Sequence, residues 1–495
     1  MEPILDLLRP HAKVYGPALA RAAYDQGLVV TRMDNTVIPI PITATPLVLE
    51  AREIQRRSDV AALLASAGLK MAQSILRGPS KELLLGALGP LERKVVEGSF
   101  ESLHRLAITR VDYFVSDRPY ALELNATIPA MPAYSDIAAE TFIEVVGRHA
   151  GLDSAEIAQL QRQNGSNTRA LYDALLRGYA AERGNRPAAR LAILVRRHDA
   201  QLSEIRALAQ RFNAWGTETR IVYPDEASRG PEGFFAQGLA FDFVYRHLFV
   251  RRLEALDAPY VLDFLTHPAG RGSVLFNGPA AHVETKTTFA LLSQSLDNRN
   301  PGNRKLASDA GLSEAEQDAV KTYVPWTRTL TNAPGRDPDG TAVRDLTEVV
   351  AADPDRYVIK RAWDYGGKAV FIGSGREEAG FSERVRTAYG NALPWRELVA
   401  RAAKDRVGGG FVVQELVKTP VQEHWIAGEG GLTPVDMYVD YSAYASVNLG
   451  EQPGWGGVCR GAPSKIVNIL GGGGVLPLLN QEVFSALTAR LRSSG

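Results

Sequence analysis

The chain has 495 residues, of which 45% are hydrophobic and 23% charged, so its composition is typical of a soluble globular protein with about three domains. Its 56 basic and 56 acidic residues balance, which argues against nucleic acid or an anionic membrane as a partner. The single cysteine, Cys459, excludes an intrachain disulfide and a cysteine-rich zinc site. Neither a secretory signal nor a run of about 18 apolar residues is visible, so we expect a cytoplasmic enzyme.

Short motifs of the common nucleotide-binding and hydrolytic enzymes are also absent. The chain has no G-x-x-x-x-G-K-[ST] phosphate loop, no G-x-S-x-G and no H-E-x-x-H. None of its eight histidines lies four residues from another. A divalent cation would therefore be held by oxygen ligands, which suits magnesium.

Hydrophobic periodicity predicts the elements at the start of the chain. Residues 1–100 are expected to be mostly helical, and the spacing of apolar side chains over 52–77 predicts a packed amphipathic helix. Residues 108–128 instead hold two runs of alternating side chains around a polar turn at Arg118 and Pro119. This pattern is typical of an antiparallel hairpin.

Strands and helices alternate in the middle of the chain. Residues 190–225 read as a βαβ unit whose helix ends at Gly216, and 241–249 and 273–279 are the next expected strands. This alternation implies an open, mostly parallel sheet that binds ligands at the carboxyl ends of its strands. The loop-rich segment 332–341 is expected to lead into another domain.

Four polar residues of the predicted hairpin form the first candidate site, namely Arg110, Asp112, Glu123 and Asn125. Glu123 and Asn125 lie two residues apart on one strand and therefore share a face, where their side-chain oxygens suit one Mg²⁺. Arg110 and Asp112 likewise share a face of the preceding strand, beside that site. The alternative is a solvated hairpin face that carries ordinary polar residues.

A second candidate site follows an apolar strand that begins near residue 356. The strand leads to Lys360, and the loop after it contains Asp364, Gly366 and Gly367. Backbone N–H groups of a glycine loop can cover phosphates while the lysine ammonium neutralises their charge. Asp364 is placed to be a further metal ligand. A plain hairpin with a Gly-Gly turn is the alternative.

A third candidate segment is the strand that starts at Phe411. It ends in Gln414, Glu415, Leu416 and Val417. Such a strand can offer its backbone to an adenine edge, with Glu415 or a neighbour reaching a ribose or amino group. A simple edge strand is the alternative.

The last candidate segment, 456–477, contains Arg460 and the glycine run 471–474. Four consecutive glycines are entropically costly, which favours a close backbone approach to a ligand or a moving lid. An ordinary flexible surface loop is the alternative.

Taken together, these motifs resemble the ATP-grasp superfamily, in which two α+β lobes clamp Mg-ATP. Because R-x-D…E-x-N comes before Lys360, their order is similar to that of the circularly permuted branch, which includes eukaryotic-type glutathione synthetase and glutathionylspermidine synthetase. The resemblance implies a mixed α/β and α+β fold, a circularly permuted ATP-grasp with an inserted Rossmann-like substrate domain. The expected parts are a helical region with the permuted segment over 1–165, the substrate domain over 166–330, and the lid and nucleotide-binding segment over 331–495.

The resemblance also implies roles for individual residues. It assigns Mg²⁺ to Glu123, Asn125 and Asp364. It gives the substrate carboxylate, and then the oxyanion, to Arg460 and Arg110. The V-P-W-T at 324–327 resembles the V-P-x-T that commonly follows an earlier ATP-contacting lysine, which would be Lys286. The expected ATP contacts are Lys286, Lys360, Gly366, Gly367, Gln414, Glu415, Leu416 and Val417.

The activity implied by the resemblance is ligation of a carboxylate to an amine through an acylphosphate, with release of ADP and phosphate. The substrates would be small-molecule or peptide acids and amines, and dimers are common in this branch. The loop reads D-Y-G-G where the glutathione enzyme has an acidic residue and three glycines. The serines with which that enzyme binds γ-glutamylcysteine are missing after E-x-N. Tyr134, Ser135 and Asp136 follow this motif and are expected to face the acceptor. A phosphotransferase and a nucleotide-binding pseudoenzyme that acts as a scaffold are the alternatives.

Overall fold

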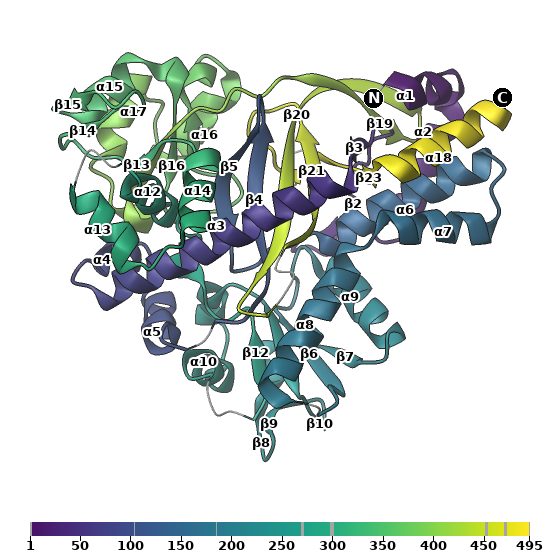
Figure 1. The fold of residues 1–495 in the computed structure, drawn as a ribbon, viewed down its shortest axis with the longest axis horizontal. Helices are drawn as coiled ribbons and strands as arrows, with labels where there is room; N and C mark the ends of the chain where they lie inside the picture. The colour runs from purple at the N-terminus through teal and green to yellow at the C-terminus, as the bar shows by residue number, and fades with distance from the viewer. Residues whose placement is uncertain are drawn as a thin grey trace.

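Three sheets with their covering helices meet in the centre of the molecule (Figure 1). The computed structural model describes residues 2–102, 104–184, 186–268, 272–297, 301–450, 454–469 and 473–494. The expected mixture of α/β and α+β structure is confirmed. The two chain ends lie near each other, where α1 (Glu2–Leu8) and α18 (Gln481–Ser494) pack together (Figure 1).

The central antiparallel sheet combines both ends of the chain. Its strand order is β22-β21-β20-β4-β5, and β19 also pairs with β20. The predicted hairpin is confirmed as β4 (Leu106–Val115) and β5 (Pro119–Asn125). The later strands are β19 (Gln422–Gly428), β20 (Gly431–Val447), β21 (Gly454–Ala462) and β22 (Gly474–Leu476).

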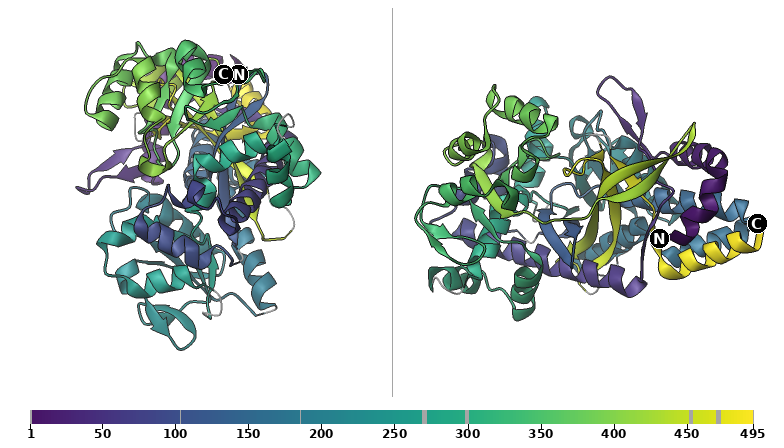
Figure 2. Two further views of the ribbon diagram at one scale, coloured as in Figure 1. Left: turned by 90° about the vertical axis from the view of Figure 1, so that its left-hand side faces the viewer. Right: turned by 90° about the horizontal axis from the view of Figure 1, so that it is seen from above.

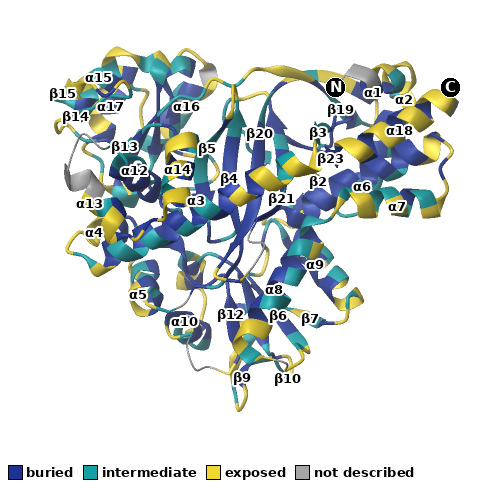
Figure 3. Ribbon diagram, viewed as in Figure 1, coloured by how far each residue is buried: buried dark blue, intermediate teal, exposed yellow. Residues whose placement is uncertain are grey.

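A long helix, α3 (Ala51–Arg77), crosses this sheet and confirms the helix predicted over 52–77. It packs on β20 and β21 with its apolar side and leaves a polar side exposed (Figure 3). Among the described helices, α3 is the one long and apolar enough to cross a membrane, but 67% of its most apolar window is buried inside the protein. Its apolar character is thus accounted for by packing against the sheet.

The parallel sheet has the strand order β12-β11-β6-β7 and confirms the predicted βαβ unit. Its strands are β6 (Arg190–Val195), β7 (Glu218–Val222), β11 (Phe243–His247) and β12 (Val274–Phe276). Helix α9 (Leu202–Ala214) connects β6 to β7, and Gly216 follows it with a φ of +100°, a conformation that favours glycine. A small antiparallel sheet, β8 (Ser228–Gly230), β9 (Gly233–Ala236) and β10 (Leu239–Ala240), extends from this part.

The third sheet is antiparallel, with the order β13-β18-β16-β17. Its strands are β13 (Thr327–Thr329), β16 (Tyr357–Arg361), β17 (Val370–Ile372) and β18 (Phe411–Glu415). Helices α15 (Leu346–Ala352), α16 (Ala379–Tyr389) and α17 (Trp395–Ala402) belong to the same apolar core. The loop-rich stretch 332–341 contains β14 (Gly335–Arg336), which pairs with β15 (Ala342–Val343). It lies within this part and does not lead into it, because β13 comes before it and already pairs with β18.

The remaining elements cover these sheets or join them. The β1–β2 hairpin (Val29–Thr31, Val37–Pro39) projects from the body (Figure 2), and β3 (Leu47–Leu49) pairs with β23 (Leu478–Asn480). The other helices are α2 (Ala12–Asp25), α4 (Glu82–Leu85), α5 (Pro90–Ser99), α6 (Pro132–His149), α7 (Ser154–Asn164), α8 (Asn167–Arg183), α10 (Pro259–Thr266), α11 (Ala281–Glu284), α12 (Lys286–Ser295), α13 (Pro301–Asp309) and α14 (Glu314–Tyr323).

Candidate active site

A cavity of about 400 Å³ lies where the three sheets meet. This volume is in the range of small-molecule sites. Its walls come from β4 and β5, from the loops that follow β6 and β11, and from the sheet that contains β16 and β18. The residues predicted to bind metal, ATP or the substrate carboxylate all line this cavity except Glu415: Arg110, Glu123, Asn125, Lys286, Lys360, Asp364, Gly366, Gly367, Gln414, Leu416, Val417 and Arg460.

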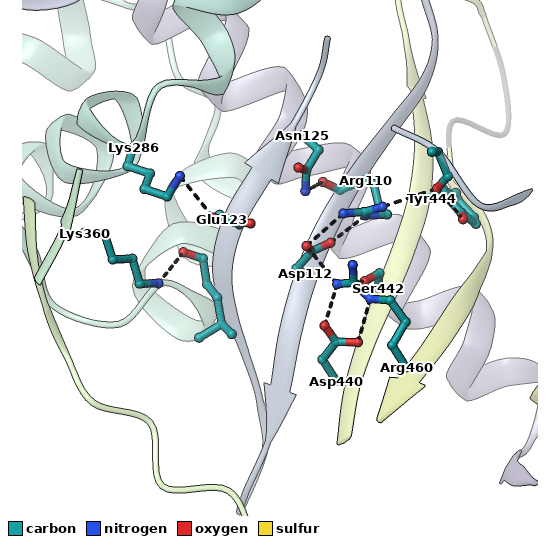
Figure 4. A network of polar contacts seen from close by, with 12 residues as sticks. Arg110, Asp112, Glu123, Asn125, Lys286, Lys360, Asp440, Ser442, Tyr444 and Arg460 are labelled. Atoms are coloured by element: carbon teal, nitrogen blue, oxygen red, sulfur yellow. Dashed lines mark hydrogen bonds and ion pairs between the residues drawn. The ribbon is translucent and has the colours of Figure 1, made fainter. Parts of the chain in front are cut away.

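The β4–β5 hairpin sets the positions of the first motif. The antiparallel register pairs Arg110 with Asn125 and Asp112 with Glu123. The Asn125 side-chain amide donates to the Arg110 carbonyl at 3.4 Å (Figure 4). The strand therefore presents a carboxylate and a carboxamide to the same cavity, as its alternation predicted.

Two lysines from distant segments approach this strand. The Lys286 ammonium lies 3.3 Å from the Glu123 carboxylate and donates to the Asp364 carbonyl at 3.1 Å. The Lys360 ammonium donates to the Gln414 side-chain oxygen at 2.7 Å and to the Leu122 carbonyl at 3.4 Å. Burial lowers the pKa of Lys360 to about 8, although Glu123 opposes this shift. Burial is the largest influence on Glu123 and works against its ionisation, but the attraction of Lys286 and Lys360 together lowers the pKa of this carboxyl.

The two arginines of the predicted site belong to one buried charge network (Figure 4). Arg110 donates to both oxygens of Asp112, at 2.7 and 3.0 Å. Arg460 bridges Asp112, at 3.1 Å, and Asp440, at 3.0 Å. The two guanidinium groups are thus balanced by two carboxylates, of which Asp112 was predicted beside Arg110 and Asp440 was not.

Asp440 is the member of this network that sequence reasoning missed. It alternates with Ser442 on β20, so that two polar side chains point to one face of a largely apolar strand. That alternation was the available signal. Burial and the neighbouring Asp112 raise the pKa of Asp440, whereas Arg110 and Arg460 overcome burial and lower the pKa of Asp112.

The glycine loop between β16 and β17 is held from one side by the late segment of the chain. Gly366 and Gly367 have φ angles of +68° and +71°. The Gly366 carbonyl accepts from the Asn468 side chain at 3.1 Å, and a Cβ on Gly367 would meet Ile466 at 2.4 Å. Glycine is therefore required at this second position by both backbone conformation and close packing.

The late glycine run lies only partly within the described residues. Residues 471 and 472 are outside them. A Cβ on Gly473 would meet the Gly461 carbonyl oxygen at 2.8 Å, and a Cβ on Gly474 would meet the Pro41 carbonyl oxygen at 2.8 Å. The close approach at this end of the run is therefore to the chain itself.

Side chains at the end of the strand that starts at Phe411 point alternately towards the cavity and away from it. Gln414 faces the cavity, where its side chain accepts from Lys360 and donates to Thr327 at 3.0 Å. Glu415 is the next residue on the strand and its carboxylate pairs with Arg356 at 3.1 Å, outside the cavity lining. The side chain of Glu415 therefore does not reach the cavity, whereas Leu416 and Val417 beyond it do.

Of the three residues after E-x-N that were expected to face the acceptor, one lines the cavity and two do not. Tyr134 lines the cavity. Ser135 donates to the Gly457 carbonyl at 2.9 Å, and Asp136 accepts from backbone N–H groups at the start of α8, so both have structural partners instead. Asp136 caps that helix because a carboxylate satisfies N–H groups that have no partner within the helix.

The loops after the parallel strands supply the rest of the cavity wall. Arg196, Asp199 and Gln201 follow β6, and Phe249 and Arg252 follow β11. The sequence placed ligands at the carboxyl ends of these strands but did not single out these residues. The first polar positions after each strand were the signal.

The cavity contains oxygen donors suited to a cation. Among the described residues, no group of three or more His, Cys, Asp or Glu side chains is arranged to hold a metal ion. The predicted donors are two carboxylates and one carboxamide, and all three line the cavity: Glu123 and Asn125 from β5, and Asp364 from the loop after β16. This oxygen set fits Mg²⁺, which commonly takes one or two carboxylates and completes its shell with water and phosphate oxygens.

Comparison with known proteins shows a likeness in fold. No protein-family model and no curated protein matches the chain in sequence. Among solved structures, the chain is similar to a glutathione synthetase-like effector from Globodera pallida in its apo form. The TM-score is 0.53 at 14% identity, and the likeness covers 97% of this chain and 98% of the other. The resemblance therefore extends through all three parts of the fold.

Proposed function

We propose that this protein is an ATP-dependent carboxylate–amine ligase of the circularly permuted ATP-grasp type. The observation that carries the proposal is the cavity into which Glu123, Lys286 and Lys360 converge from three distant segments. The fold likeness to a glutathione synthetase-like protein supports the same family of enzymes. The order of the motifs, with E-x-N ahead of the loop lysine, supports the permuted branch.

The nucleotide would lie between the third sheet and the β4–β5 hairpin. Lys286 and Lys360 present ammonium groups that can neutralise phosphate oxygens, and the backbone at Leu416 and Val417 lines the side suited to adenine. Mg²⁺ on Glu123, Asn125 and Asp364 would supply charge neutralisation and fixed geometry for the triphosphate.

The proposed reaction has two steps. A carboxylate oxygen of the first substrate attacks the γ-phosphorus of ATP, and the bond to the bridging oxygen breaks, which gives an acylphosphate and ADP. The amine of the second substrate then attacks the acyl carbon, loses a proton, and displaces inorganic phosphate. In both steps Lys286 and Lys360 offset negative charge, and the glycine loop excludes water from the acylphosphate.

The arginine network suggests how the acid is oriented. Arg460 lines the cavity, but its charge is balanced by Asp112 and Asp440. It therefore offers oriented N–H donors rather than a net positive charge. Donors that are fixed in advance stabilise a developing oxyanion without reorganisation.

The test is release of ADP and phosphate from Mg-ATP with pooled amino acids, small peptides and polyamines, with hydroxylamine added in parallel. A ligase gives acid-dependent phosphate release and a trapped hydroxamate. A phosphotransferase gives ADP and a stable phosphorylated product instead. A scaffold binds nucleotide without any turnover, and either of these last outcomes refutes the ligase.

Variants connect the activity to the cavity. We expect Lys286→Met and Lys360→Met each to reduce kcat/KM by at least about a hundredfold, because each removes a charge that faces the phosphates. Lys404→Met is the matched control, since Lys404 is exposed and outside the cavity lining. Equal activity of all three variants would refute the assigned site.

A further inference from the structure

The glycine loop contains a tyrosine that contacts the part of the protein built around the parallel sheet. Tyr365 lies directly before Gly366 and Gly367, between β16 and β17. Its ring stacks on Phe249, with ring centroids 5.3 Å apart and an angle of 25° between the planes. Its hydroxyl accepts from Arg252 at 2.7 Å. Since Phe249 and Arg252 follow β11, one side chain joins the glycine loop to the loop beyond the parallel sheet.

Cations surround the stacked rings. The Arg251 guanidinium lies 4.3 Å from the Tyr365 ring centroid and 5.0 Å from that of Phe249, and the Lys368 ammonium lies 4.6 Å from the Tyr365 ring. Two nitrogens of Arg251, Nε and Nη2, are buried without a hydrogen-bond partner in the described structure. The ring faces are therefore the principal neighbours of this guanidinium, an arrangement in which cation–π attraction is strongest.

The base of the loop has a further anchor at Trp363, which shares its neighbours Arg251 and Phe249 with the tyrosine. Trp363 donates to the Glu92 carboxylate at 2.9 Å, and Arg251 also lies over its ring, at 5.2 Å. The far side of the glycine pair rests on the late segment through Ile466 and Asn468, as described above. Between these supports, Tyr365 makes the contact with the loop after β11 at the cavity edge, and both Tyr365 and Phe249 line the cavity.

Two glycines in succession make a loop that opens easily, because neither residue restricts its backbone. Stacking, a hydrogen bond and two cations at the residue before them oppose that opening. These contacts therefore hold the glycine loop against the loop after β11.

We propose that Tyr365 is a positioning residue that holds the glycine loop closed on the loop after β11, and so prepares the phosphate end of the cavity for ATP. This inference rests on the proposed function for its catalytic consequence, but not for the closure itself. Closing the glycine loop onto the loop after β11 also couples nucleotide binding to the part of the protein that contains the parallel sheet.

The first test does not depend on activity. Lys368 is exposed in the glycine loop, so trypsin cleavage after it in the full chain without nucleotide measures opening. We expect Tyr365→Gly to accelerate this cleavage about tenfold, as loss of one aromatic pair implies, and Tyr365→Phe to accelerate it much less. Phe249→Leu should accelerate cleavage after Lys368 to the same extent as Tyr365→Gly, although Phe249 lies outside the glycine loop, after β11.

Cleavage after Lys404, exposed just after α17 in the same lobe as the glycine loop, is the control. Unchanged cleavage after Lys368 in Tyr365→Gly overturns the proposal, and so does an equal rise at both lysines, which would mean general loosening.

The second test measures catalysis. With a loose loop, KM for ATP should rise more than kcat falls, and ADP release should exceed amide formation because water reaches the acylphosphate. Tyr365→Phe should restore most of the coupling. If the proteolysis result holds while the wild type never turns over ATP, the ligase proposal fails and the closure stands. If the wild type is an active ligase and Tyr365→Gly keeps its KM and coupling, the positioning role fails alone.

Discussion

Asp112 and Asp440 belong to one buried network, but their replacement by asparagine should lower the free energy of unfolding by different amounts. Asp112 accepts from Arg110 at 2.7 and 3.0 Å and from Arg460 at 3.1 Å. Asp440 accepts hydrogen bonds from one arginine, Arg460, and lies near the Asp112 anion. We therefore expect replacement of Asp112 to be the more costly of the two.

The magnitudes follow from the charges left behind. Asp112→Asn leaves two guanidinium groups with one carboxylate in a site that is almost closed to water, and breaking a buried pair costs about 3–5 kcal/mol of unfolding free energy. Asp440→Asn removes a carboxylate that burial and Asp112 already disfavour as an anion, so we expect a cost of about 1–2 kcal/mol, the value of one charged hydrogen bond.

Urea unfolding followed by circular dichroism measures both costs, and their pH dependence gives an internal check. A carboxyl whose pKa is raised by folding contributes stability that is lost as the pH rises, so the gap between wild type and Asp440→Asn should narrow from pH 4 to pH 7. Asp112 has a lowered pKa and keeps its contribution over that interval. An Asp440→Asn variant that costs as much as Asp112→Asn would refute this account of the network.

Three further predictions concern the glycine loop, the third segment and the buried histidines. Gly367→Ala combines a φ of +71° with a steric clash, so ATP affinity should fall at least about tenfold by calorimetry, whereas Gly390→Ala, with a φ of +82° and open space, should leave it unchanged. Glu415→Gln should change KM for ATP by less than about threefold in steady-state assays, because its partly exposed ion pair lies outside the cavity. Burial lowers the pKa of His104 to about 4 and that of His282 well below its ordinary value, so stability should fall as the pH drops from 6.5 towards 4, by about 2 kcal/mol for His104 at pH 5. Urea unfolding of His104→Leu at pH 8 and pH 5 checks this, and an unchanged pH dependence in the variant would contradict it.

Elements with a local side-chain pattern could be predicted from the amino-acid sequence alone. The helix over 52–77, the 108–128 hairpin and the βαβ unit were readable because side-chain alternation and helical spacing report which face of one element is buried. The same alternation placed Glu123 and Asn125 on one face, and strand ends indicated Lys360. These residues needed no knowledge of the rest of the chain.

Which of these faces meet depends on how the elements pack in three dimensions. Pairing of β4 with β20 brings Arg460 and Asp440 to Asp112, and no local pattern encodes a contact across more than three hundred residues. Packing between distant elements also makes Asp136 a cap of α8 and pairs Glu415 with Arg356. A polar side chain that becomes buried bonds to the partner that folding places beside it. Local periodicity fixes which side chains point inward, whereas the burial of apolar surface between elements far apart in sequence selects their neighbours.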